Sequence, residues 1–294
     1  MTVNQGIVWL ASYPKSGNTW FRVFLTHIIN GTNCNLNLNR TSIVGTGCAA
    51  RFMMDRALGF DSRLLYEEEL ERLRPSIYDW HAKNQPGVQY FKIHDACYTA
   101  TNKASVIPKK ISIGAIYFIR NPLDVVISFA YHMNCSINDA IQMMNCPTLA
   151  LKGSAAKPLS QIRQVCSSWS WHVESWISNS DINVLTLRYE DMIYSPGKTF
   201  SSALAFLQIK VSEDIFLNAL DKSQFAQLKQ DEQINGFRES AAPERPFFRK
   251  GIAGDWVNTL TDSQIKRIVS DHGPMMRHFG YLDVNNQPVT GECN

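Results

Sequence analysis

The chain has 294 residues, 45% of them hydrophobic and 19% charged, so a sizeable core can form and wholesale disorder is excluded. The net charge of +3 suits a small anionic ligand and argues against a nucleic-acid partner, which needs a concentrated basic face. Neither a signal peptide nor an apolar stretch of membrane-spanning length is visible, so we expect a cytoplasmic protein with no membrane partner.

Cysteine and histidine usage predicts no metal site. The seven cysteines are scattered and never form a C-x-x-C pair, which fits a reducing compartment and small buried hydrophobic roles. The seven histidines show neither H-x-x-x-H nor H-E-x-x-H spacing, so we expect no structural or catalytic metal.

Strand and helix patterns alternate along the chain. Short, nearly continuous apolar runs predict buried parallel strands at residues 7–12, 89–93, 113–119 and 182–187. Helical patterns occupy residues 18–29, 64–73, 122–132, 162–177, 199–207 and 262–277. We therefore predict an α/β fold, a single domain over residues 1–294 with a central, mostly parallel, doubly wound sheet flanked by helices. Residues 30–59 and 134–158 are expected to form long loops or irregular lids.

The first strand, loop and helix form an anion cradle. Lys15, Ser16 and Gly17 separate the strand from a helix whose first turn offers unpaired N–H groups and a partial positive charge. Gly17 lets the backbone approach an anion, so we expect a nucleotide phosphate here; an ordinary strand-to-helix turn is the alternative. The loop differs from the Mg²⁺-dependent G-x-x-x-x-G-K-[ST] pattern, because Lys15 precedes the glycine.

Polar residues also follow the other three predicted strands. Lys92 and His94 end the second, Arg120 follows the third, and residues 188–191 follow the fourth. Ligands in such sheets bind at the carboxyl ends of the strands. This convergence predicts one functional site along that edge of the sheet.

Taken together, these stretches resemble the sulfotransferases that use 3′-phosphoadenosine 5′-phosphosulfate (PAPS). Residues 13–20 are similar to the family's 5′-phosphosulfate loop, Y-P-K-S-G-T-T-W, with Asn18 in place of a threonine. Residues 119–128 are similar to its 3′-phosphate segment, and residues 248–256 to its R-K-G-x-x-G-D-W loop. The motifs occur in the family's order between residues 7 and 262, and the resemblance implies the P-loop-like sulfotransferase fold.

The resemblance also implies a role for each motif residue. Lys15 would bind the phosphosulfate and the bridging oxygen on which charge grows. Trp20 and Phe225 would face the purine, and Arg120, Ser128 and the C-terminal loop would hold the 3′-phosphate. Because Ser128 comes eight positions after Arg120, that match needs a bent helix entry or an extended residue near Pro122. The implied nucleotide-binding residues are Lys15, Ser16, Gly17, Asn18, Thr19, Trp20, Arg120, Ser128, Tyr189, Ser223, Phe225, Arg249, Lys250 and Gly251.

The implied catalytic residues are His94, Lys15 and Lys92. His94 stands two residues after Lys92, as in the family's K-T-H pattern, although Ile93 replaces the threonine. His94 would take the acceptor's proton while Lys92 stabilises the transferring sulfuryl oxygens. The reaction would be an in-line displacement at sulfur that leaves 3′-phosphoadenosine 5′-phosphate (PAP) and needs no metal.

The resemblance says less about the acceptor and the oligomeric state. The W-L-A-S-Y-P-K-S-G-N-T-W opening looks closer to bacterial sulfotransferases of secondary metabolism, which implies a small acceptor such as an alkaloid toxin or a glycopeptide. The family's dimer motif, K-x-x-x-T-V-x-x-x-E, is not matched after residue 256, so the oligomeric state stays open. Two alternatives remain, a Mg²⁺-dependent nucleotide kinase with an atypical phosphate loop and a non-catalytic nucleotide-binding protein.

Overall fold

The computed structural model describes residues 5–31, 37–38, 44–100, 105–152, 160–178, 181–240 and 245–290. Contacts between residues group the chain into two compact units, each assembled from separate stretches. The first unit comprises Met1–Tyr13, Gly45–Tyr117 and Met143–Thr186, and the second comprises Pro14–Val44, Phe118–Gln142 and Leu187–Asn294. That the chain forms a single domain stays a prediction.

A central parallel sheet of five strands confirms the predicted fold class, with the strand order β2-β3-β1-β4-β7. The strands are β1 (Gln5–Ser12), β2 (Thr46–Gly47), β3 (Gly87–Ile93), β4 (Ser112–Ile119) and β7 (Val184–Arg188). β1 pairs with β3 in parallel from Gln5 opposite Gly87 to Ala11 opposite Ile93. β1 is buried from its second residue onward, as expected for a strand covered on both faces. The four predicted strands are confirmed, and the two-residue β2 was not predicted.

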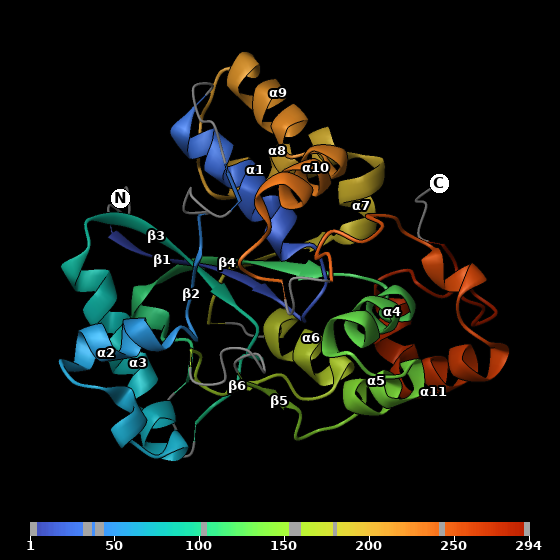
Figure 1. The fold of residues 1–294 in the computed structure, drawn as a ribbon, viewed down its shortest axis with the longest axis horizontal. Coiled ribbons are helices and arrows are strands. Elements are labelled where there is room, and N and C mark those ends of the chain that lie inside the picture. Colours follow the sequence, from blue (N-terminus) through green and yellow to red (C-terminus); the bar gives the residue numbers. More distant parts are fainter. Residues whose placement is uncertain are drawn as a thin grey trace. The chain divides into compact units, whose positions relative to one another are not determined.

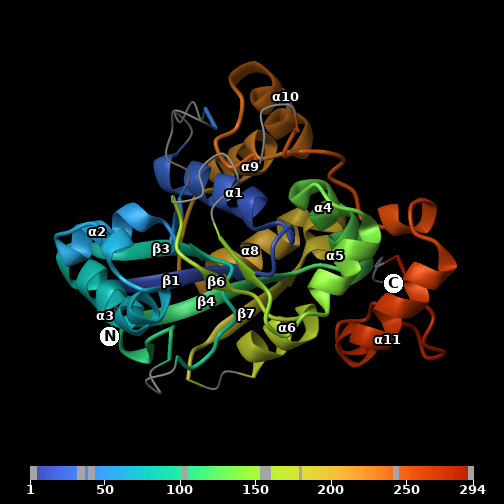
Figure 2. The same cartoon turned by 60° about the horizontal axis from the view of Figure 1, so that its bottom comes forward.

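The first unit places helices beside β1 and β3. Its helices are α2 (Arg51–Leu58), α3 (Glu67–Asn84) and α6 (Trp169–Ile177). Figures 1 and 2 show α2 and α3 side by side, and α3 also contacts β1. At that contact Trp9 meets Tyr78 and Phe91 edge to face, with ring centroids 5.4 and 5.8 Å apart. Aromatic burial of this kind anchors the helix layer to the sheet.

Several predicted boundaries in this part of the chain are wrong. The helix predicted at residues 64–73 begins at Glu67 and continues to Asn84. The helix predicted at residues 162–177 begins only at Trp169, because the Ser168 hydroxyl caps it by accepting from the Trp171 N–H. The region predicted as a loop at residues 30–59 contains α2.

The region predicted as a loop at residues 134–158 also contains regular structure. It holds α5 (Ile137–Met144) and the short strand β5 (Ala150–Leu151). β5 pairs in antiparallel fashion with β6 (Gln164–Val165). β6 thus occupies residues that were predicted to be helical.

The second unit is mostly helical. Its helices are α1 (Asn18–Asn30), α4 (Pro122–Met133), α7 (Tyr189–Tyr194), α8 (Pro196–Phe206), α9 (Glu213–Lys222), α10 (Phe225–Asn235) and α11 (Asp262–His278). α1 packs along α9, and α4 packs against α11 (Figure 1). Phe24 stacks obliquely on Phe200 with ring centroids 4.6 Å apart, and Phe21 meets Phe118 at 5.2 Å. α7, α9 and α10 were not predicted.

The described residues also form short 3₁₀ helices, η1 (Ser62–Leu64), η2 (Lys109–Ile111) and η3 (Asp255–Asn258). Among the described residues, no helix is long and apolar enough to cross a membrane.

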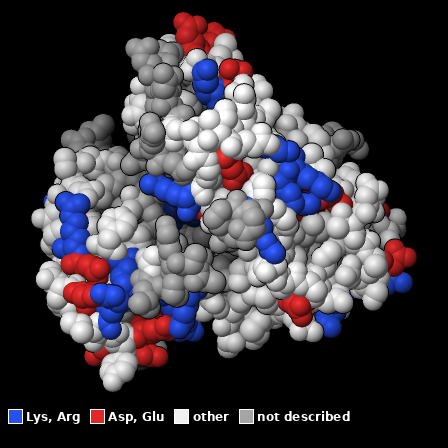
Figure 3. Space-filling model, in the orientation of Figure 1, with Lys and Arg blue, Asp and Glu red and all other residues white. Residues whose placement is uncertain are grey.

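Charges of both signs are mixed on the surface over α2 and α3. Figure 3 shows Lys and Arg interspersed with Asp and Glu in that part of the view. Ion pairs join Arg63 to Asp61 and Lys83 to Asp79 there. A mixed surface of this kind offers no concentrated basic face, although the exclusion of nucleic acid stays a prediction for the whole chain.

Candidate nucleotide site and candidate base

The predicted phosphate loop turns sharply into α1 in the second unit. Lys15 has a φ of 71° and Gly17 a φ of 96°, so both lie in the left-handed region. Gly17 is the N-cap of α1 and has no side chain to accept from the first turn. Because helix N–H groups at such an end lack intrahelical partners, this geometry suits an anion, as predicted. Lys15 Nζ lies 3.8 Å from the centre of the Phe247 ring.

Gly17 is also required by a close approach that the sequence did not reveal. A Cβ at this position would lie 2.7 Å from Cδ2 of Tyr189. Tyr189 is buried at the start of α7, and Trp20 meets its ring edge to face at 6.2 Å. The predicted nucleotide residue Tyr189 therefore forms the wall against which the phosphate loop is packed.

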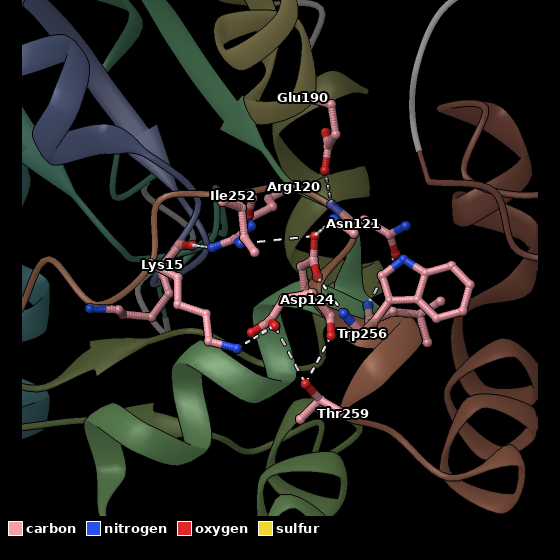
Figure 4. A network of polar contacts seen from close by, with 12 residues as sticks. Lys15, Arg120, Asn121, Asp124, Glu190, Ile252, Trp256 and Thr259 are labelled. Atoms are coloured by element: carbon pink, nitrogen blue, oxygen red, sulfur yellow. Dashed lines mark hydrogen bonds and ion pairs between the residues drawn. The ribbon is translucent and has the colours of Figure 1, made fainter. Parts of the chain in front are cut away.

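Arg120 ties the phosphate loop to the C-terminal loop (Figure 4). Its Nη1 donates to the Lys15 carbonyl at 3.3 Å, and its Nη2 donates to the Ile252 carbonyl at 2.9 Å. The guanidinium carbon lies 4.3 Å from the centre of the Tyr189 ring, a cation–π arrangement. Arg120 is only 8% exposed. It thus holds together three segments that the sequence predicted to share a site.

Three buried donors around this loop lack a hydrogen-bond partner among the described residues. They are Ser16 Oγ, Trp20 Nε1 and Arg120 Nε. A buried donor left unsatisfied costs about 1–3 kcal/mol, so such groups are rare unless a ligand or water accepts from them. Their chemistry fits a ligand that is rich in acceptors and negatively charged.

The C-terminal loop carries a second cationic cluster. Arg249 Nη2 and Lys250 Nζ donate to the Asp255 carboxylate at 2.7 and 2.6 Å. Partial burial pushes the pKa of Asp255 upward, but the hydrogen bonds from Lys250 and Arg249 outweigh it and lower the pKa overall. Asp255 therefore stays ionised and already holds both cations in one place.

Asp124 fastens this loop to the start of α4. Its carboxylate accepts from the N–H groups of Gly254 at 2.8 Å and Trp256 at 3.1 Å, as Figure 4 shows for Trp256. Burial raises the pKa of Asp124, against the opposing effects of Arg120 and the two N–H groups. Asp124 lies within the motif at residues 119–128, but the sequence assigned it no role in this loop contact.

Glu190 is a second such residue. It is fully buried and accepts from the Asn121 N–H and from the Tyr281 hydroxyl, both at 2.9 Å. Burial raises its pKa, which the Asn121 N–H partly offsets. Glu190 thus fixes the residue next to Arg120. Residues 188–191 were predicted to lie at the strand end that forms the site, but nothing local identified partners of Glu190 so distant in the sequence.

The remaining predicted nucleotide residues also lie in the second unit. Ser128 is half-buried within α4, and Asn121, the N-cap of α4, has a φ of −48° and a ψ of 121°. Asn121 therefore lies outside the helical conformation, and the role of Ser128 stays a prediction. Ser223 is buried and its hydroxyl donates to the Leu220 carbonyl.

Phe225 opens α10 and packs against the C-terminal loop. A Cβ on Gly251, which has a φ of 67°, would lie 2.2 Å from Cδ2 of Phe225. Only glycine therefore fits at position 251 with this ring in place.

The candidate base and Lys92 belong to the first unit. Lys92 is half-buried near the end of β3, paired with Leu10 of β1. His94 follows the strand, and its Nδ1 lies 2.8 Å from the Ser12 carbonyl oxygen and 3.2 Å from Ser12 Oγ. Because a carbonyl only accepts, Nδ1 carries a proton, and in the neutral form of the ring the lone pair is then on Nε2. The structure gathers the predicted nucleotide residues in the second unit, and His94 and Lys92 in the first.

Comparisons with known proteins agree with these observations. The sulfotransferase domain model matches residues 5–280. Sulfotransferase 1 family member D1 from Mus musculus is 26% identical over 276 residues, which cover 90% of this chain and 81% of the relative. An amine sulfotransferase from Oryctolagus cuniculus is 27% identical over 271 residues, covering 88% of this chain and 77% of the relative.

Solved structures share the fold. Mouse sulfotransferase SULT7A1 complexed with PAP aligns with a TM-score of 0.59 at 22% identity, covering 93% of this chain and 85% of that one. Retinol dehydratase, in complex with androsterone and the inactive cofactor PAP, aligns with a TM-score of 0.63 at 19% identity, covering 95% of this chain and 83% of that one.

The chain therefore belongs to the sulfotransferase family, the PAPS-dependent class that its motifs resemble. The predictions of an enzyme of this class and of its α/β fold are confirmed. Family membership decides against the kinase alternative. Within the described residues, no three His, Cys, Asp or Glu side chains gather as a metal site; independence from metal, like the role of each site residue, stays a prediction.

Proposed function

We propose that this enzyme transfers a sulfuryl group from PAPS to a hydroxyl or nitrogen of a small-molecule acceptor, with His94 as the base. One observation carries the proposal: Arg120 joins the Lys15 loop to the C-terminal loop, amid buried donors that have no partner in the described residues. An acceptor-rich anion with two phosphate-bearing positions matches that arrangement.

In this proposal, residues of the second unit would bind each part of the nucleotide. The N-terminus of α1 and Lys15 would hold the 5′-phosphosulfate. Trp20 and Phe225 would contact the purine. Arg120 and Ser128, with the loop at residues 249–251, would hold the 3′-phosphate. Arg249 and Lys250 are gathered on the Asp255 carboxylate at 2.7 and 2.6 Å, and a phosphate dianion would compete for them as the more highly charged acceptor.

The proposed sulfuryl transfer moves negative charge to the leaving phosphate and a proton to the base. PAPS supplies an activated sulfuryl group, and its departing PAP phosphate gains negative charge as the bridging bond breaks. Lys15 would stabilise that charge. The acceptor's oxygen or nitrogen forms the new bond to sulfur, and its proton passes to Nε2 of His94, where the tautomer fixed by Ser12 leaves a lone pair. Lys92 would stabilise the sulfuryl oxygens during transfer.

For the acceptor, we propose a secondary metabolite such as an alkaloid toxin or a glycopeptide, sulfated in the cytoplasm. The support is the sequence of the first strand and the phosphate loop, W-L-A-S-Y-P-K-S-G-N-T-W, which resembles that of bacterial sulfotransferases of secondary metabolism. A screen of amine and hydroxyl acceptors from these classes, followed by mass spectrometry for the added sulfuryl group, tests this part. Sulfation of simple phenols in preference to every such metabolite would contradict it.

Binding of PAP tests the donor site directly. A thermal-shift measurement should show stabilisation by PAP without metal, and much less by ADP with or without Mg²⁺. Arg120→Ala should weaken PAP binding by roughly 2–3 kcal/mol, as expected for a lost charge-assisted hydrogen bond. Stabilisation by ADP only when Mg²⁺ is present would overturn the donor assignment.

The role of His94 needs a separate measurement. His94→Ala should abolish sulfuryl transfer and leave PAP affinity within about twofold of the parent, because the proposed role of His94 is toward the acceptor. Lys92→Ala is the companion variant, since it removes a cation from the same strand end. Turnover of His94→Ala within a few-fold of the parent would show that the base is misassigned.

A further inference from the structure

The main chain of His94 is held by side chains that the proposed chemistry does not use. Its carbonyl oxygen accepts from His172 Nε2 at 3.1 Å and from Cys166 Sγ at 3.2 Å. β3 ends at Ile93, so His94 lies beyond the strand. Side chains from distant segments of the first unit therefore take over the positioning of this residue.

The next residue, Asp95, is held more firmly still. Its carboxylate accepts from Arg74 at 2.9 and 2.6 Å and from the Val165 N–H at 2.8 Å. Its carbonyl accepts from Trp176 Nε1 at 3.0 Å. Both partners of the ion pair are buried, Arg74 at 1% exposure and Asp95 at 0%. This buried anchor limits the freedom of His94 from its C-terminal side.

The hydrogen-bond directions around His172 follow from its partners. The His94 carbonyl only accepts, so His172 Nε2 must carry a proton and donate. His172 Nδ1, 2.8 Å from the Tyr117 hydroxyl, then has a lone pair and accepts the Tyr117 proton. His172 is 0% exposed, and burial lowers its pKa to about 3, which keeps the ring neutral. Both ring nitrogens are thus committed to one arrangement.

We propose that His172 is a positioning residue for His94, with Tyr117 fixing the tautomer that donates to the His94 carbonyl. This inference rests on the proposed function of His94 as the base. The Ser12 carbonyl orients the His94 ring through Nδ1, and His172 holds its main chain, so the base is fixed at two points. Because a displacement of about 1 Å can cost roughly 100-fold in rate, such restraint matters for proton transfer.

Three variants of α6 test the proposal in the full-length enzyme. His172→Leu removes both hydrogen bonds, whereas His172→Gln keeps one amide donor and one carbonyl acceptor. Val173→Ala is the matched control, because Val173 is equally buried on the same helix and its side chain has no hydrogen-bonding group. For each variant we would measure kcat, the acceptor KM, the Kd for PAP and the thermal midpoint.

The proposal predicts that kcat falls while the affinity for PAP is retained. His172→Leu should lower kcat by roughly 10- to 100-fold with the PAP Kd within about twofold of the parent, and His172→Gln should recover most of the loss. Val173→Ala should keep parental kcat even where its thermal midpoint falls. If His172→Leu does not fold, Tyr117→Phe replaces it and should lower kcat several-fold, because His172 loses the donor that fixes its tautomer.

Two results would overturn the inference. One is a folded His172→Leu enzyme, or Tyr117→Phe in its place, with parental kcat. The other is a loss of kcat in Val173→Ala equal to that in His172→Leu, which would show a general effect of α6 packing. Failure of the proposed function looks different: His94→Ala would then retain turnover, and the positioning role would fall with the base itself.

Discussion

Gly251 offers the sharpest test of how the C-terminal loop meets the proposed purine site. In Gly251→Ala, the new Cβ would lie 2.2 to 2.5 Å from three atoms of the Phe225 ring, well inside van der Waals contact. The residue also has a φ of 67°, which costs an L-residue about 1–2 kcal/mol. If the ring and the loop keep their positions, overpacking adds about 1–3 kcal/mol. Gly251→Ala should then lower the free energy of unfolding by about 2–5 kcal/mol in total.

Gly280→Ala separates the two contributions. Gly280 has a φ of 69°, and nothing lies within 4 Å of the Cβ it would gain. This variant therefore carries the backbone strain alone and should lose about 1–2 kcal/mol of unfolding free energy, with unchanged PAP affinity. Denaturant unfolding and calorimetric titration with PAP would be run on both variants and on the parent.

Where Phe225 or the loop moves to admit the methyl group, the clash is relieved in the free protein and appears in PAP binding instead. The same 1–3 kcal/mol then corresponds to roughly 5- to 150-fold weaker PAP binding than in Gly280→Ala. Adding Phe225→Leu to Gly251→Ala should restore stability because the smaller side chain relieves the overlap. Equal stability and equal PAP affinity in the two single variants would refute this account of the loop.

Three further predictions concern buried titratable residues. Asp124→Ala should weaken PAP binding by about 10-fold or more, because two N–H groups of the C-terminal loop lose their acceptor; unchanged affinity by titration would contradict it. Arg74→Met should cost about 3–5 kcal/mol in denaturant unfolding, since it leaves the Asp95 carboxylate buried without its cation, and a loss below 1 kcal/mol would count against a buried pair. The pKa of His172 is about 3 in the folded protein, against 6.5 for a free histidine. Between these two pH values the unfolded chain therefore binds more protons than the folded protein. The stability that His172 contributes above pH 6.5 is lost as the pH falls toward 3. The titration of His172 should lower the free energy of unfolding by about 2 kcal/mol between pH 7 and pH 5. In His172→Gln, the loss of unfolding free energy over this pH range should be smaller by that amount.

Much of the sheet could be predicted because its strands are short, apolar and bounded by polar residues. The helices were harder. α10 buries only Leu228 and Glu232, so it has no apolar stripe for a periodic pattern to reveal. α2 has no capping side chain at Ala50 and is eight residues long, which left nothing to separate it from a loop.

α6 also begins later than predicted, at Trp169. Residues 162–168 continue the apolar character of the helix, but Gln164 and Val165 pair with β5 instead. That pairing depends on a segment elsewhere in the chain, so tertiary contacts overrode local propensity.

The class of protein, the order of the strands along the chain and the motifs proposed to bind the nucleotide could all be predicted from the residues alone. These features are local: a strand, a turn and a helix start follow one another closely in the chain, where propensity and spacing set the conformation. The distant groups that hold those motifs in place became visible only in the folded molecule. Asp124 reaches Gly254, Glu190 reaches Tyr281, and His172 reaches the His94 carbonyl. Each contact joins segments whose proximity follows from the packing of the fold, which no local pattern of residues records.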